Sequence, residues 1–231
     1  MSAQPAAHWR VLLDTQAVCD TAIQRIAQAA SQALAERGAF HIVLAGGGTP
    51  KAVYEALPAL PTDWSRWHVY YGDERCLPPE HADRNSRMAW QAWLSRVAVP
   101  AGQHHIMPAE LGPVRAAERY AKVVSGVRFD LTLLGLGEDG HTASLFPGNP
   151  LGDAAGSADV LAVSNAAKPP PERVSLSAAC LSRSREVIFL VSGTAKRDAV
   201  RRWRAGEDIP AAHIHCGVGV DVLLESASLP Q

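Results

Sequence analysis

The sequence predicts a three-layer α/β/α architecture around a mostly parallel, Rossmann-like sheet. Three observations support this fold class: four short apolar segments that each end in glycine or small polar residues, amphipathic segments between them, and no regular polar–apolar alternation within the apolar segments. Strands covered by helices on both sides lack that alternation, because both of their faces are buried. The 231 residues have the length of one large domain, and we predict a single domain over residues 1–231.

The predicted strands and helices alternate along the chain. Strands cover residues 41–45, 67–71, 129–134 and 186–191, and helices cover residues 16–37, 50–57, 84–95, 113–125 and 195–204. Residues 148–171 are rich in glycine, proline, alanine and serine, which indicates a surface excursion, and we place a further strand around His213 and His215. Such sheets bind ligands beyond the carboxyl ends of their strands, so we expect the functional site in the loops that follow them.

Composition excludes several classes of protein. Apolar residues make up 47% of the chain and charged residues 19%, which excludes disorder. The net charge of -1 gives no overall field that would attract nucleic acid or an anionic membrane. Met1–Pro5 lacks the basic and apolar segments of a secretory signal, and no apolar run is long enough to span a bilayer. We expect a cytoplasmic protein, favour a monomer, and expect neither a nucleic-acid nor a membrane partner.

Metal and disulfide chemistry are not expected. The four cysteines are scattered, and none forms a C-x-x-C pair. His104 and His105 are adjacent, which turns their side chains apart, while His213 and His215 lie two residues apart on the expected strand. Neither pair has an acidic residue or a cysteine at the spacing of metal ligands, so we predict no metal site.

The first candidate site is the glycine loop Gly46-Gly47-Gly48-Thr49-Pro50, which joins a strand to a helix. Glycines let the backbone turn sharply and approach a ligand closely, while Thr49 is a good N-cap and Pro50 suits the first helical position. The free N–H groups and the helix dipole then favour an anion at this loop. A tight turn without any ligand explains the same residues equally well.

A second candidate site follows the next strand. Gly72-Asp73-Glu74-Arg75 brings two carboxylates and a guanidinium to a strand end. Asp73 could orient a water or a hydroxyl there, and Arg75 could pair with an oxyanion or a phosphate. Downstream, we expect Asp83 to cap the helix that starts near Arg84. A solvated turn with a local ion pair is the alternative interpretation of these residues.

The segment Gly135–Pro147 contains G-x-G-x-x-G after a strand, the pattern of dinucleotide-binding loops. Pro147 interrupts the helix that such a loop requires, and no strand with an acidic end follows at the right distance, so we predict no cofactor. What remains is a loop that presents Asp139 and His141. A histidine titrates near neutral pH and is the usual general base, although a hydrogen-bonded structural histidine is the alternative.

Two basic residues complete the candidates. Arg173 follows the proline triplet 169–171, and Lys196 lies in the first turn of a helix. There its charge opposes the helix dipole, at a cost of about 0.3–1 kcal/mol unless an anion is bound nearby. This unfavourable placement indicates a function for Lys196, although exposed lysines are common on helices.

The order of these motifs resembles that of the 6-phosphogluconolactonases, which share a superfamily with glucosamine-6-phosphate isomerase/deaminase. The resemblance extends from the first long helix to about residue 225, and its most specific segment is Gly137–Pro147. It implies a three-layer α/β domain. It also implies hydrolysis of 6-phospho-D-glucono-1,5-lactone to 6-phospho-D-gluconate in the oxidative pentose phosphate pathway.

The resemblance further implies roles for individual residues. The phosphate would be held by Gly46, Gly47, Gly48, Thr49, Arg173 and Lys196. The lactone ring would be surrounded by Asp73, Arg75 and His141. We interpret His141 as the general base and Arg75 as the group that stabilises the oxyanion. Asp73 would hold a sugar hydroxyl or the attacking water, and Asp139 would orient the loop.

Two alternative functions remain open. The deaminases carry a glutamate five residues after the loop histidine for opening the sugar ring, and this chain has Phe146 there, which disfavours deaminase or isomerase activity. A non-catalytic sugar-phosphate sensor would need the glycine loop and Lys196, but neither His141 nor Asp73.

Overall fold

The central element of the molecule is a six-stranded parallel sheet with the strand order β1-β9-β8-β5-β2-β3. The computed structural model describes residues 7–230, so Met1–Pro5, where we see no secretory signal, lie outside the described residues. The six strands are β1 (Ala7–Leu12), β2 (Phe40–Leu44), β3 (Trp67–Tyr71), β5 (Leu131–Gly135), β8 (Glu186–Val191) and β9 (Val220–Glu225). Strands β5 and β8 lie in the middle of this order and are buried almost throughout, which explains their continuous apolar sequence.

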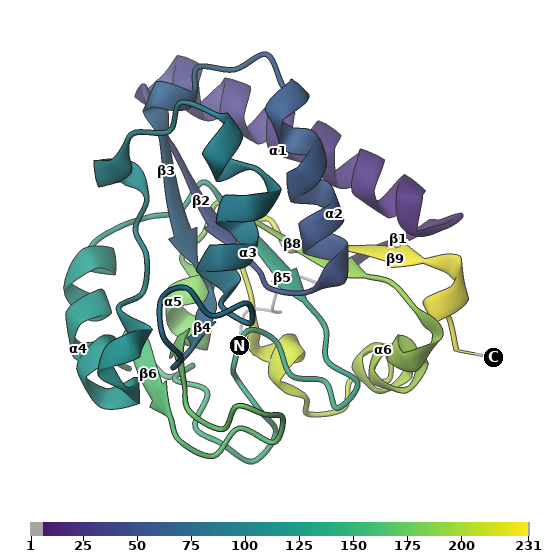
Figure 1. Cartoon of the computed structure of the whole chain (residues 1–231). Coiled ribbons are helices and arrows are strands. Elements are labelled where there is room, and N and C mark those ends of the chain that lie inside the picture. Colours follow the sequence, from purple (N-terminus) through teal and green to yellow (C-terminus); the bar gives the residue numbers. More distant parts are fainter. Residues whose placement is uncertain (1–6, 231) are drawn as a thin grey trace.

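Helices cover both faces of this sheet. The helices are α1 (Thr15–Arg37), α2 (Gly48–Ala56), α3 (Asn85–Ala92), α4 (Pro113–Val124), α5 (Ala178–Ser182) and α6 (Arg197–Arg204). Figure 1 shows α1 and α2 above the sheet and α6 below it. On the α6 side, Trp203 packs edge-on against Phe189 and Trp9, with ring centroids 4.7 and 5.2 Å apart. The predicted three-layer α/β/α architecture is confirmed.

A second, antiparallel sheet of three strands lies beside the first. It has the order β4-β7-β6, with β4 (Asp73–Arg75), β7 (Arg173–Leu176) and β6 (Val160–Val163). Helix α4 packs against β6 and β7. The prediction that residues 148–171 are only a surface excursion is therefore wrong for β6, where Val160 and Val163 are buried.

The four predicted strands are confirmed as β2, β3, β5 and β8, whereas β9 was placed wrongly and β1, β4, β6 and β7 were not predicted. The strand expected around His213 and His215 is absent, because His213 ends a short 3₁₀ turn that begins at Pro210. The strand of this region is β9, which starts after Gly219. Strand β1 was not predicted, since its outer residues are exposed at the edge of the sheet.

The predicted helix caps are also corrected. Helix α2 begins at Gly48 with Gly47 as its N-cap, two residues earlier than a Thr49 cap would allow, because Gly47 adopts a φ of 109°. The side chain of Asp83 does not cap α3. Arg84 occupies the N-cap position of α3. The first two N–H groups of the helix, those of Asn85 and Ser86, donate to the carboxylate of Glu74.

Buried apolar side chains form one cluster that runs from Val18 of α1 to Leu224 of β9. The single-domain organisation of residues 1–231 stays a prediction. None of the helices within residues 7–230 combines the length and the apolar character needed to cross a membrane.

Candidate active site

A cavity of about 250 Å³ opens at the carboxyl ends of β2, β3, β5 and β8. The predicted site residues that line it are Gly46, Gly47, Gly48, Thr49, Asp73, Arg75, His141, Arg173 and Lys196. Asp139 is the predicted site residue outside this lining, and its carboxylate hydrogen-bonds His141 instead. Loops that lie up to about 150 residues apart in the sequence thus meet at one site, as the topology of a parallel sheet requires.

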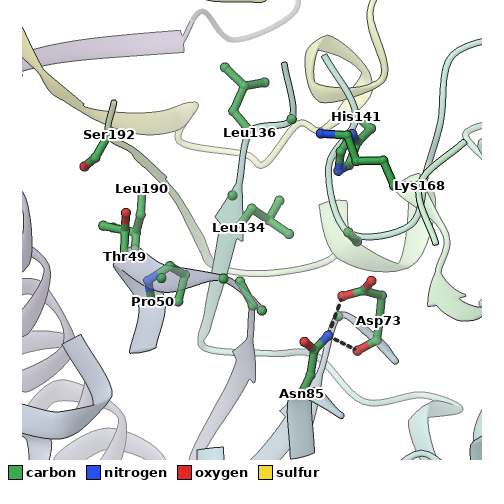
Figure 2. Close-up of a pocket in the computed structure, with 18 of the residues that line it drawn as sticks. Thr49, Pro50, Asp73, Asn85, Leu134, Leu136, His141, Lys168, Leu190 and Ser192 are labelled. Atoms are coloured by element: carbon green, nitrogen blue, oxygen red, sulfur yellow. Dashed lines mark hydrogen bonds between the residues drawn. The ribbon is translucent and has the colours of Figure 1, made fainter. Parts of the chain in front are cut away.

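The glycine loop lies at one side of the cavity, where Figure 2 shows Thr49 and Pro50. Gly46 lies directly against the side chain of Asn85, since a Cβ at this position would stand 2.2 Å from Asn85 Oδ1. Gly47 needs the positive φ that starts α2. The first turn of α2 therefore reaches the cavity with backbone N–H groups that a helix leaves unpaired.

Lys196 and Ser192 follow β8 and line the same cavity. Burial lowers the pKa of Lys196, against the attraction of Glu138. The hydroxyl of Ser192 is buried and makes no hydrogen bond within residues 7–230. Figure 2 places Ser192 on the same side of the cavity as Thr49. A half-buried ammonium and an unpaired hydroxyl beside a helix N-terminus are suited to an anion.

His141 lies across the cavity from the glycine loop (Figure 2). Its Nδ1 is 2.5 Å from Asp139 Oδ1, and its ring centroid is 4.7 Å from that of Phe146. A Cβ on Gly137 would stand 2.0 Å from Nδ1, so only glycine leaves room for this ring. Burial lowers the pKa of His141, with Asp139 opposing the shift, and the imidazole is accordingly neutral at pH 7.

Asp73 lies between α3 and the loop that carries His141. Its Oδ1 accepts from Asn85 Nδ2 at 3.0 Å, and its Oδ2 accepts from the Ser144 hydroxyl at 2.6 Å. Asp73 is 6% exposed, and these two donors compensate part of the cost of burying its carboxylate. These hydrogen bonds fix Asp73 at the wall of the cavity. The ion pair of Asp73 with Arg173 is longer, with 3.9 Å between Asp73 Oδ2 and Arg173 Nη1.

Arg75 and Arg173 are paired across the β4–β7 ladder. Arg173 donates to the carbonyls of Lys168 and Pro170, and its Nη1 is 3.9 Å from Asp73 Oδ2. Its guanidinium lies 5.6 Å from the ring centre of Phe146. The Nη1 of Arg75 donates to the Asp83 carbonyl, while its Nε is buried without a partner in the described part of the chain. Both guanidiniums are thus held in place at the Asp73 side of the cavity.

Glu74 does not reach the cavity, contrary to our expectation for both carboxylates of this segment. Neighbouring residues of a strand point to opposite sides, so Glu74 points away when Asp73 and Arg75 line the cavity. Its side chain is fully buried, accepts from the N–H groups of Asn85 and Ser86 at 2.8 Å, and pairs with Arg84.

Four residues of the site were not predicted from the sequence: Asn85, Ser144, Lys168 and Ser192. Asn85 lies in the predicted helix 84–95 and Ser144 lies in the segment Gly135–Pro147, but their partners lie in other segments. Lys168 and Ser192 carry no local pattern, and only the folded loops bring them to the cavity. Residues 7–230 contain no group of three or more His, Cys, Asp or Glu side chains placed to hold a metal ion.

The sequence matches the family model described as glucosamine-6-phosphate isomerases/6-phosphogluconolactonase over residues 13–223. A protein of Synechocystis named 6-phosphogluconolactonase is 38% identical over 213 residues, which cover 87% of this chain and 86% of that protein. The 6-phosphogluconolactonase of Mycobacterium tuberculosis is 37% identical over 217 residues, covering 86% of this chain and 87% of the relative.

Solved structures show the same relationship. The crystal structure of 6-phosphogluconolactonase from Thermotoga maritima superposes with a TM-score of 0.87 at 28% identity, covering 95% of this chain and all of that one. A monomeric glucosamine-6-phosphate deaminase has the same fold, with a TM-score of 0.83 at 19% identity. The fold is thus common to both activities, and the predicted family is confirmed. The chain belongs to the glucosamine-6-phosphate isomerase/6-phosphogluconolactonase family.

Proposed function

We propose that the chain hydrolyses 6-phospho-D-glucono-1,5-lactone to 6-phospho-D-gluconate, the lactone-opening step of the oxidative pentose phosphate pathway. One observation carries this proposal: a single cavity has an anion-binding loop with Lys196 at one side and the Asp139–His141 pair at the other. Relatives named 6-phosphogluconolactonase that match along most of both chains support the choice of substrate.

The phosphate is assigned to the glycine-loop side. The N–H groups at the start of α2, the ammonium of Lys196 and the free hydroxyl of Ser192 supply donors there. Arg173 adds a positive charge to the same cavity from the Asp73 side, and we retain it among the residues that hold the substrate's negative charges. Binding at the phosphate fixes the distance from the glycine loop to the lactone carbonyl.

His141 is assigned as the general base. Its Nδ1–H donates to Asp139, which leaves the lone pair of Nε2 free to accept a proton. Because burial lowers its pKa, the imidazole is in the basic form at neutral pH. Asp139 also stabilises the imidazolium that forms during the reaction.

The reaction then needs no covalent intermediate, since a lactone is an activated ester. The water oxygen bonds to C1 while His141 Nε2 takes its proton, and the carbonyl oxygen becomes an oxyanion that Arg75 stabilises. Collapse of the oxyanion breaks the bond between C1 and the ring oxygen. The ring oxygen receives the proton from the imidazolium, which gives a hydroxyl and a carboxylic acid. The acid then releases its proton to water and becomes the carboxylate, and this proton is what a pH-stat titrates.

The test is a pH-stat assay with freshly generated lactone, in which spontaneous hydrolysis is subtracted. We expect His141→Ala to lower kcat by about 10²- to 10⁴-fold with little change in KM, because the base acts only in the transition state. Turnover of His141→Ala close to that of the wild type would refute the base assignment. Binding without acceleration would indicate a sensor, and ammonia release from glucosamine 6-phosphate would indicate a deaminase.

A further inference from the structure

The turn that follows His141 has an unusual backbone. Ala143 has a φ of 48° and is the one non-glycine residue within residues 7–230 that lies in the left-handed region. The N–H of Leu145 donates to the Thr142 carbonyl at 2.9 Å and closes the turn. A left-handed alanine costs on the order of 1 kcal/mol, so contacts around the turn must hold it in this conformation.

Those contacts come from both sheets. The Thr142 hydroxyl donates to the Gly135 carbonyl at the end of β5, at 2.9 Å. The Ser144 hydroxyl donates to Asp73 on β4 at 2.6 Å, and the Ser144 N–H donates to the Ser175 hydroxyl on β7 at 3.2 Å. Ser144 is 1% exposed, so water does not compete for these bonds. The turn is therefore fixed to the large sheet at one end and to the small sheet at the other.

The hydrogen bond to Asp73 has a direct relation to the cavity. Asp73 and His141 both line the cavity, whereas Ser144 does not. Ser144 lies three residues after His141 and contacts the carboxylate from the side opposite Asn85. Its hydroxyl therefore connects the loop that carries the base with the strand that carries the carboxylate.

We propose that Ser144 is a positioning residue for lactone hydrolysis, which holds the His141 loop and the Asp73 carboxylate at a fixed relative position. This inference rests on the proposed function. Ser144 acts through Asp73 and the loop and does not touch the substrate, so its loss changes the geometry of the reacting groups and leaves the phosphate side intact.

The test compares Ser144→Ala with Ser184→Ala in the lactone assay. Ser184 is a matched control, because its buried hydroxyl donates to the Leu181 carbonyl at 2.7 Å and does not line the cavity. We expect Ser144→Ala to lower kcat about 10- to 100-fold and to change KM by less than about twofold. We expect Ser184→Ala to lower the melting temperature with kcat close to the wild-type value.

The pH profile gives a second readout that lower stability alone does not move. The charged groups that face His141 are Asp139, Lys168 and Asp73, and Ser144→Ala leaves all three in the chain. Loosening the loop hydrates the ring, so the acidic limb of kcat/KM is expected at higher pH in Ser144→Ala and at its wild-type position in Ser184→Ala.

The outcomes separate the two proposals. A wild-type protein without lactonase activity would refute the proposed function itself. With an active wild type, the role of Ser144 is refuted by a kcat of Ser144→Ala within twofold of the wild type, by a loss confined to KM, or by an equal loss of kcat in Ser184→Ala.

Discussion

The His141 ring is constrained on several sides before any substrate binds. Asp139 fixes its Nδ1, Phe146 packs at 4.7 Å, and Gly137 permits the close approach of the backbone. Each constraint reduces the reorganisation needed to reach the transition state, which is a major part of how preorganised sites accelerate reactions. Phe146 also lies beneath the Arg173 guanidinium, so one aromatic ring contacts two residues that line the cavity, His141 and Arg173.

At the same scale, Lys196 is expected to determine the preference for phosphorylated substrates. Lys196→Met keeps the apolar stem and removes the charge. It should raise KM for 6-phosphogluconolactone at least about 10-fold, equivalent to about 1.4 kcal/mol, and leave KM for unphosphorylated gluconolactone nearly unchanged. Both constants come from the same pH-stat assay.

The control is Lys122→Met, on the exposed surface of α4. It should leave KM for both substrates unchanged. If Lys196→Met weakens both substrates equally, the ammonium does not bind the phosphate.

In strand β4, the adjacent carboxylates of Asp73 and Glu74 have different roles. Its three residues alternate in direction, so Asp73 and Arg75 line the cavity while Glu74 points into the protein and accepts from the start of α3. Helix α3 then supplies Asn85, which holds Asp73. The stability of this helix and the geometry of the site are therefore linked through a single strand.

We expect Glu74→Ala to destabilise the protein by about 3–5 kcal/mol, because the substitution removes the buried carboxylate 3.1 Å from Arg84, leaves that guanidinium only the partly exposed Glu110 at 3.4 Å, and takes the cap from α3. Urea unfolding measures the change. Glu80→Ala is the matched control, since Glu80 forms an exposed ion pair with Arg87 at 2.9 Å, and such pairs contribute about 0–1 kcal/mol. Equal effects of the two substitutions would contradict this account.

At the element scale, the strands that could be predicted are those whose pattern is local. Strands β2, β3, β5 and β8 are apolar runs closed by glycine or serine, and burial between helices explains both features. Strand β1 is exposed along one edge, and β6 and β7 are short and pair only with each other and β4. Their positions depend on long-range pairing, which no local pattern encodes.

The whole molecule places its cavity where the two sheets meet. Gly72 connects β3 of the large sheet to β4 of the small one, and its N–H and carbonyl bond to Leu44 and Leu176 on either side. Most of the predicted site residues lie together here because they follow the carboxyl ends of strands of the large sheet, while Asp73 and Arg75 lie on β4 and Arg173 begins β7 of the small sheet. Lys168 and Ser144 could not be found in advance, because their contacts arise from the small sheet, which the sequence did not reveal.

A stack of aromatic rings at the β3 edge makes the stability of the whole molecule sensitive to acid. His68 and Tyr70 flank His105, with ring centroids 5.5 and 4.3 Å away. Burial lowers the pKa of His104 and of His105 to about 4. Unfolded histidine titrates near about 6.5, so the unfolded chain binds more protons between these values. The stabilisation is complete above pH about 6.5 and is lost as the pH falls towards 4.

Urea unfolding over this pH range should therefore show a falling free energy of unfolding. His105→Gln should make the fall shallower, because one titrating ring with a lowered pKa is removed. A free energy that stays level between about pH 7 and pH 4.5 would rule out this role of the stack.

The position of β1 beside β9 has a consequence for biosynthesis. Residues 7–12 emerge from the ribosome early, but the strand with which they pair comprises residues 220–225. The early segment must wait, with neither of its edges paired, until residues 220–225 have been translated. The pairing of β1 is thus a late event in the synthesis of this fold, and termination shortly before residue 220 would leave residues 7–12 without a partner strand and exposed to aggregation or proteolysis.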